Sequence, residues 1–263
     1  MRLYWEIARR GYRRYAVYPA ATWAGVFTNT AFGFMQAYIF LAVFEHRQDV
    51  GGFDVTKTLT YVWLAQAMIS TVAVFGWSDL ALRIRSGDIA TDLARPAHPL
   101  RVGLAADFGR AAYQAVFRGI PPFIVGALAF ELTAPQSPLV VLAFLASLVL
   151  AIVVSYAFRA LYNLSAFWLL DHRGAMLIGV TLSLFFSGFI VPLPFFPGWL
   201  EAIAYATPFP SLVQIPVDIF VGQSQGLEIP LALAQQLGWA AVLFALVQGV
   251  FAIGTRKLVI QGG

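Results

Sequence analysis

Long apolar segments alternate with short polar ones along the 263 residues of the chain. A helix rises about 1.5 Å per residue, so about 20 predominantly apolar residues cross a hydrocarbon core of about 30 Å. Six segments fit this expectation, and they occupy residues 18–44, 59–77, 113–130, 139 to about 158 or beyond, 175–191 and 231–254. The pattern predicts an all-α polytopic membrane protein, with six transmembrane helices in a single domain over residues 1–263.

Residues 1–17 have the pattern of a helix that lies in the membrane interface. At 100° per residue, aromatic and small residues such as Trp5 share one broad face, and arginines occupy the other. We predict an amphipathic interfacial helix with Trp5 at headgroup depth and with Arg9, Arg10 and Arg13 on its polar face. The alternative is a basic flank without a further role.

The longest polar stretch, residues 78–110, predicts two short helices. Ser78 or Asp79 can cap the first, and Gly87 interrupts it. Asp88 can begin the second, which Pro96 ends. Apolar contact points surrounded by charges of both signs are typical of a docking surface for another protein. An ordinary solvated loop is the alternative.

Residues 192–230 contain seven prolines and no basic residue, yet they are apolar. The segment is too interrupted for a full span and too apolar for a free loop. Irregular backbone at membrane depth is tolerated where protein covers it or where it lines a cavity. We therefore predict re-entrant or interfacial helices on the outer side, before the last span.

Composition agrees with a membrane protein, because 60% of the residues are hydrophobic and 11% are charged. Soluble domains carry roughly 25% charged residues, so a soluble enzyme or a nucleic-acid-binding domain is excluded. Basic residues collect in cytoplasmic loops, which predicts that both termini are cytoplasmic. In this orientation the inner segments hold 14 of the 17 basic residues: Arg2, Arg9, Arg10, Arg13, Arg14, Arg83, Arg85, Arg95, Arg101, Arg110, Arg159, Arg173, Arg256 and Lys257.

The sequence offers little chemistry of its own. It has no cysteine, no phosphate-loop motif, no HExxH motif and only three widely separated histidines. Residues 222–226 match the GxSxG pattern around Ser224, which needs a strand, a sharp turn and a helix; a flexible turn is the alternative. We predict no catalytic residue, metal site or bound cofactor, and the near absence of ionisable residues in the spans suggests that a partner supplies the energy.

One stretch resembles a known family. Residues 84–96, IRSGDIATDLARP, are similar to the I-x-x-G-x-(I/L)-x-x-x-L-x-R-P stretch between the second and third spans of type-2 (export) ABC transporter permeases. The layout also agrees: a basic N-terminal helix, six spans and a proline-aromatic insertion at residues 193–199. Arg159 and residues 171–173 match no motif of the family, and we expect Arg159 at the inner membrane interface.

The resemblance implies a permease subunit in the inner membrane of a prokaryote. Its partners would be two ATPase subunits, which bind ATP and magnesium, a second permease that is identical or distinct, and membrane lipid. The coupling helix would consist of Arg83, Ile84, Arg85, Gly87, Asp88, Ile89, Leu93, Arg95 and Pro96. Phe195, Phe196 and Trp199 would line an outer gate for a hydrophobic or amphipathic substrate, or form an ordinary aromatic belt.

Two other functions remain open at this point. A self-contained channel or secondary transporter would work without an ATPase, and a lipid-modifying membrane enzyme would use Ser224. The sequence does not identify the substrate.

Overall fold

The computed structural model describes residues 2–75, 79–169 and 171–257. Regular secondary structure in these ranges is helical, apart from one isolated antiparallel bridge between Val50 and Phe53. The predicted all-α fold class is therefore confirmed. Trp77 and Ser78, which bound two of the predicted segments, lie outside the described residues.

Three of the described helices are long and apolar enough to cross a membrane. They fall on the first, fourth and sixth predicted spans, and they are α2 (Pro19–Phe44), α8 (Pro138–Leu164) and α12 (Glu228–Thr255). The helical run of α8 continues beyond residue 158 through the 3-10 turn η2 (Ser165–Phe167). About a third or less of the apolar stretch of each helix is buried, so all three present wide apolar faces outward.

The other three predicted spans fall on elements outside this group. α3 (Val55–Val72) is buried along most of its length and forms the centre of the bundle. α6 (Pro99–Gln114), η1 (Ala115–Gly119) and α7 (Ile120–Ala129) follow one another without a break, and α9 (Arg173–Phe186) has only 14 residues. Six spans therefore stay a prediction.

The element η1 is a π-helical turn, and its position follows from the two prolines after it. Pro121 and Pro122 have no N–H to donate, and a proline ring collides with the carbonyl four residues before it. The wider turn relieves this collision, and the N–H of Ile120 bonds to the oxygen of Ala115, five residues back. The chain thus continues from η1 into α7 without a break in the helix.

The predicted proline-rich segment consists of short helices. α9 ends at Phe186, before the predicted boundary at residue 191, and Gly188 turns the chain with a φ of +83°. The segment that follows comprises η3 (Leu193–Phe195), α10 (Gly198–Tyr205), η4 (Phe209–Ser211) and α11 (Gln214–Val221). α11 packs against α3 and α8 and is buried along most of its length, whereas α10 is largely exposed.

The N-terminal helix α1 (Arg2–Ala16) lies along α6. A methyl group added at Gly109 would come within 1.8 Å of the carbonyl oxygen of Ala8, and one added at Gly11 within 2.3 Å of that of Ala106. The two backbones approach this closely because both positions are glycine. The predicted apolar face of α1 therefore meets α6 in part, whereas Trp5 on its edge is 70% exposed.

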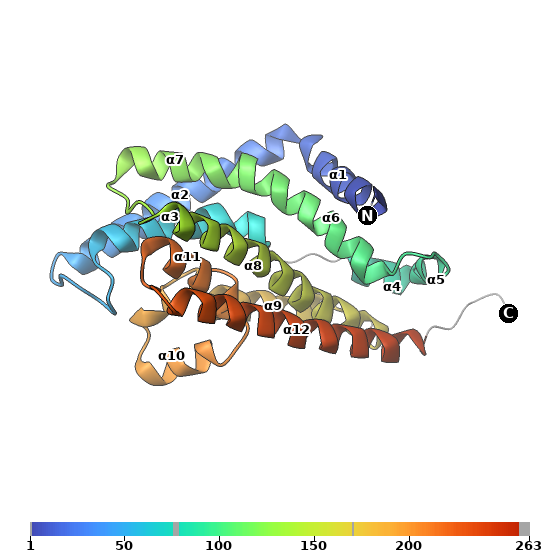
Figure 1. Cartoon of the computed structure of the whole chain (residues 1–263). Coiled ribbons are helices and arrows are strands. Elements are labelled where there is room, and N and C mark those ends of the chain that lie inside the picture. The colour runs from blue at the N-terminus through green and yellow to red at the C-terminus, as the bar shows by residue number, and fades with distance from the viewer. Residues whose placement is uncertain (1, 76–78, 170, 258–263) are drawn as a thin grey trace.

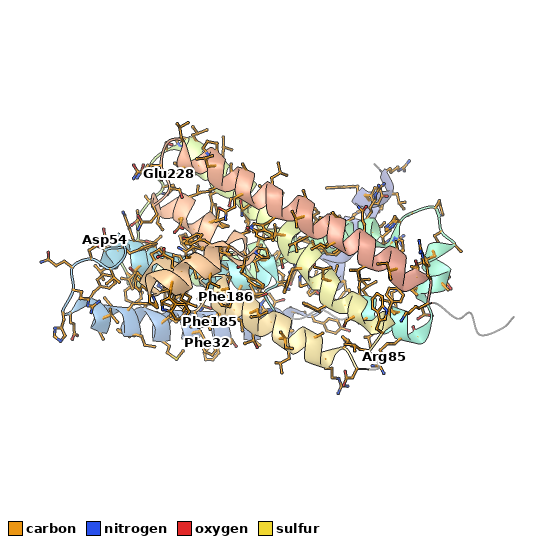
Figure 2. The ribbon with its side chains drawn as sticks, turned by 90° about the horizontal axis from the view of Figure 1, so that it is seen from below. Phe32, Asp54, Arg85, Phe185, Phe186 and Glu228 are labelled. Carbon is orange, nitrogen blue, oxygen red and sulfur yellow. The ribbon has the colours of Figure 1, made fainter. Side chains whose placement is uncertain are left out.

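The bundle has two distinct ends. Figure 1 shows the N-terminus, α4 (Asp79–Ser86), α5 (Ile89–Leu93) and the last turns of α12 at one end, with α10 and α11 toward the other. We call the first the basic end, because it carries the arginines of α1 and α4. In Figure 2 the side chain of Arg85 lies at the basic end, whereas Asp54 and Glu228 lie at the opposite end. The charge segregation read from the sequence is thus present in three dimensions.

Candidate functional site

At the basic end, α4 and α5 form a tight helical pair joined at Gly87. This glycine has a φ of +81°, a left-handed conformation that a side chain would strain. Asp88 precedes α5 as predicted, but its carboxylate accepts a 2.7 Å hydrogen bond from the Ser86 hydroxyl instead of capping the helix. The turn between the two short helices is therefore set by Gly87 and by the Ser86–Asp88 contact.

A carboxylate that the sequence analysis did not select organises the arginines of this pair. Asp92 of α5 accepts a 2.6 Å hydrogen bond from Arg83, and Arg95 lies 3.5 Å from its other oxygen. Arg85 is exposed at the basic end (Figure 2). Two of the predicted basic residues thus stabilise the pair internally, and one is available to a partner.

The apolar residues of the pair divide in the same way. Ile84 and Ile89 are buried and belong to the hydrophobic core of the bundle. Leu93 is 41% exposed and Leu82, not predicted, is 54% exposed. Pro96 is exposed in the loop that leads to α6. The inward isoleucines hold the pair in place, and the outward leucines leave apolar surface uncovered.

Polar contacts connect α4 to two other helices. The backbone N–H of Ala81, in the first turn of α4, donates to the side-chain oxygen of Asn163 in α8 at 3.1 Å. Asp79 accepts a 2.8 Å hydrogen bond from Arg14 of α1. This hydrogen bond and the attraction of the carboxylate raise the pKa of Arg14. The start of α4 is therefore held from both α1 and α8.

A cluster of charged side chains is buried between α3, α6 and α8. The carboxylate of Asp107 in α6 pairs with Arg110 at 2.7 Å and with Arg159 of α8 at 2.6 Å. Arg110 also donates to the carbonyls of Ser70 and Thr71 near the end of α3. The last turn of a helix leaves carbonyls without intrahelical partners, and the cluster satisfies them without water. Asp107, Arg110 and Arg159 thereby join α3, α6 and α8.

Arg159 is surrounded by protein. We expect it at the inner membrane interface, because an isolated arginine is costly inside a bilayer, and its depth in the membrane stays a prediction. In the structure Arg159 is 2% exposed and is compensated by Asp107, 52 positions earlier in the chain. Asn163, one turn later, donates to the carbonyl of Arg159 at 2.7 Å, so the cluster is continuous with the cap of α4.

The three predicted aromatic gate residues have different surroundings. Phe195 packs edge-to-face against Phe40 and Phe53, at centroid distances of 5.7 and 5.9 Å. Phe196 stacks on Phe185 of α9, and Trp199 is 68% exposed. Within this chain the three therefore do not line a common surface. Their predicted role in a gate stays a prediction.

A buried polar network behind these aromatics escaped the sequence analysis. The side-chain oxygen of Gln214 accepts hydrogen bonds from the Tyr61 hydroxyl and the Leu193 N–H, at 2.7 and 2.9 Å. Its amide nitrogen donates to Asp218 at 2.8 Å. Burial raises the pKa of Asp218 to about 8, although the bond from Gln214 opposes the shift. No local motif marks this network, because its members come from three separate segments.

The GxSxG string is part of a helix ending. Gly222 ends α11 in the left-handed conformation, and the N–H groups of Gln223 and Ser224 both donate to the carbonyl of Asp218. The strand–turn–helix arrangement that exposes a nucleophilic serine is not what surrounds Ser224. In the ranges that the structure describes, no group of three or more histidine, aspartate or glutamate side chains could hold a metal ion.

Comparison with known proteins places these elements in a family context. The family model described as "ABC-2 family transporter protein" matches residues 30–262. No curated protein matches the chain. The matched range includes α4, α5, the Asp107 cluster and the proline-rich segment, and it leaves out α1 and the first turns of α2.

Proposed function

The chain belongs to the ABC-2 family of transporter proteins, and on this premise we propose that it is the membrane permease subunit of an ATP-driven exporter. Members of this family are transport components and not enzymes. Separate ATPase subunits, two per complex, would bind ATP and magnesium, since this sequence has no phosphate loop. The complex would reside in the inner membrane of a prokaryote with both termini of this chain cytoplasmic.

The observation that carries the proposal is the α4–α5 pair. It lies at the basic end, which we expect in the cytoplasm because basic residues collect in cytoplasmic loops. Arg85, Asp88 and Leu93 are exposed there, and they offer a partner both charge and apolar surface. We propose that this surface docks into a cleft of the ATPase as a coupling helix.

The contacts of α4 suggest how ATPase motion reaches the membrane. Ala81 is bonded to Asn163, Asn163 to Arg159, and Arg159 to Asp107. A displacement of α4 would therefore act on α8 and α6 through hydrogen bonds, without intervening loops. Coupling of this kind requires an element with two arrangements, and we propose that rocking of this permease against a second one supplies them.

The second permease would be identical or distinct, and it would pack on the apolar faces that this chain leaves uncovered. We propose that the translocation path forms between the two subunits and that α10, with Phe195, Phe196 and Trp199 near it, helps to gate the outer side. The path would accept a hydrophobic or amphipathic substrate, because the long apolar helices offer few counter-charges.

Copurification tests the proposal most directly. Gentle solubilisation of the tagged chain from its native membrane should recover a second protein with a phosphate-loop motif, identified by mass spectrometry. The recovered complex should hydrolyse ATP. Recovery of the chain alone, with transport indifferent to ATP after reconstitution, would contradict the proposal and favour a self-contained channel or carrier.

A charge exchange tests the coupling surface. Arg85→Glu combined with Asp88→Lys reverses two exposed charges, so ATP hydrolysis should continue while transport is lost. Asp171→Lys combined with Arg173→Glu is the matched control, because this exposed pair lies outside α4 and α5. Full transport by the Arg85/Asp88 variant would remove the coupling role of this surface.

A further inference from the structure

Two hollows at the basic end meet around the same three side chains. One of about 300 Å³ opens between α1, the start of α2 and η1, and one of about 280 Å³ extends toward the end of α3. Tyr15, Gln114 and Arg118 line both. They lie beside the first turns of α2 and the last turn of α3, and under the proposed topology this is where the membrane surface meets the basic end.

Arg118 has no counter-ion in this space. Within the described ranges no carboxylate lies within ion-pair distance of its guanidinium, and its buried Nε atom has no hydrogen-bond partner. The guanidinium crosses α2 at Gly25, where an added methyl group would come within 2.1 Å of it. A half-buried arginine without a partner is costly, so the site lacks a compensating anion.

The charges around Arg118 increase the need for a compensating anion. Arg110 and Arg159 also line the second hollow, and both are paired with the same carboxylate, that of Asp107. Three guanidinium groups therefore accompany one carboxylate in this region. The remaining basic residue, Arg14, is neutralised by Asp79. The hollow carries an excess of two positive charges, which favours a bound anion.

Gln114 adds a second requirement. Its side chain is only 5% exposed, and its buried oxygen has no hydrogen-bond donor among the described residues. A buried acceptor without a donor destabilises the folded state. A ligand that carries a hydroxyl next to its anionic group would satisfy both Gln114 and Arg118. Phosphate suits arginine in particular, because the guanidinium can bind two of its oxygens at once.

We propose that this hollow binds the phosphate of an anionic phospholipid whose headgroup carries a hydroxyl, in the leaflet at the basic end. The chemistry matches a phosphoglycerol headgroup, with Arg118 on the phosphate and Gln114 on the glycerol hydroxyl. Tyr18 and Trp23, both exposed at the start of α2, lie where aromatic side chains meet headgroups. The bound lipid would bridge α1, α2 and α6–η1.

The test uses the full chain in detergent and measures thermal unfolding against added lipid. Short-chain phosphatidylglycerol should raise the unfolding temperature of the wild type by several degrees, because a ligand that binds the folded state stabilises it. Short-chain phosphatidylcholine, which lacks both net charge and hydroxyl, should give a clearly smaller shift. Inorganic phosphate identifies a soluble anion as the ligand if it alone reproduces the full shift, and this outcome would overturn the lipid assignment.

Two variants assign the effect to Arg118. Arg118→Gln should weaken phosphatidylglycerol binding about tenfold or more, since it removes a charge-assisted hydrogen bond. Without lipid it should unfold no earlier than the wild type, because it also removes an unpaired charge. Gly25→Ala should weaken binding as well by displacing the guanidinium, whereas Arg173→Gln, at an exposed arginine, should not. Equal responses of the wild type and Arg118→Gln to phosphatidylglycerol would overturn the site.

Discussion

At the scale of single residues, Asp107 is the carboxylate on which two buried arginines depend. It neutralises Arg110 and Arg159 in a region where all three side chains are almost fully buried. Removal of one member of a buried pair leaves an uncompensated charge, which is far more damaging than loss of an exposed ion pair.

We therefore predict that Asp107→Asn destabilises the protein by about 3–5 kcal/mol. Asp171→Asn removes a carboxylate from an exposed pair at the same end and should change stability by less than about 0.5 kcal/mol. Denaturant or thermal unfolding in detergent measures both. Similar unfolding of Asp107→Asn and the wild type would show that water solvates the two arginines.

A pH dependence is expected at the opposite end of the bundle. Burial raises the pKa of Asp218 to about 8, and the charge of Glu201 adds to this shift, whereas the pKa of an aspartate in the unfolded chain is about 3.9. The folded state keeps a proton that the unfolded chain releases, so this contribution to stability is complete below about pH 4 and is lost as the pH rises through about 8.

The measurement is the unfolding temperature between pH 5 and pH 8. Asp218→Asn keeps the shape of the side chain and cannot ionise, so its unfolding temperature should fall less over this range than that of the wild type. Parallel curves for the two proteins would mean that Asp218 is already ionised in the folded state.

These residues also show what the sequence can and cannot predict. The positions of Ile84, Gly87 and Ile89 follow from local patterns, because burial periodicity and glycine punctuation act within a few residues. The pairing of Asp107 with Arg159 and the bond from Tyr61 to Gln214 depend on how distant helices pack. The local patterns of a single sequence do not reveal which positions 52 or 153 residues apart are in contact.

At the scale of elements, the contact of α1 with α6 gives the N-terminal helix a structural partner. The amphipathic pattern of residues 1–17 predicts a helix with two faces, but it does not distinguish a lipid surface from another helix as the cover of the apolar face. The close approach at Gly11 and Gly109 makes that distinction, since two backbones meet only where side chains are absent.

Gly109→Ala should therefore loosen α1 from α6. The added methyl group would meet the backbone of Ala8, which cannot move independently of its helix, so we expect a lower unfolding temperature and faster amide hydrogen exchange in α1. Gly249→Ala is the matched control in α12, where the methyl group meets open space; helix propensity should leave that variant as stable as the wild type or more so. Unchanged exchange in Gly109→Ala would argue against the packed contact.

At the scale of the whole molecule, the separation of charge between the two ends predicts how the protein is oriented in the membrane. The chain contains no cysteine, so single introduced cysteines report accessibility without background. Ser86 is the last residue of α4 and is exposed at the basic end, and His46 lies in the exposed turn after α2.

In intact cells, a membrane-impermeant thiol reagent should label His46→Cys and not Ser86→Cys. Labelling of both after membrane disruption provides the control for reactivity. The reverse pattern would invert the topology and would remove the α4–α5 pair from the compartment that contains ATP.

The charged cluster also bears on the order in which the chain is made. α6 is synthesised before α8, and Arg110 can already neutralise Asp107 within one turn of the same helix. Arg159 arrives 52 residues later, inside one of the most apolar helices of the chain, with no acid of its own nearby. We therefore expect α8 to complete its insertion only after α6 is in place, so that correct assembly of the later helix depends on the earlier one.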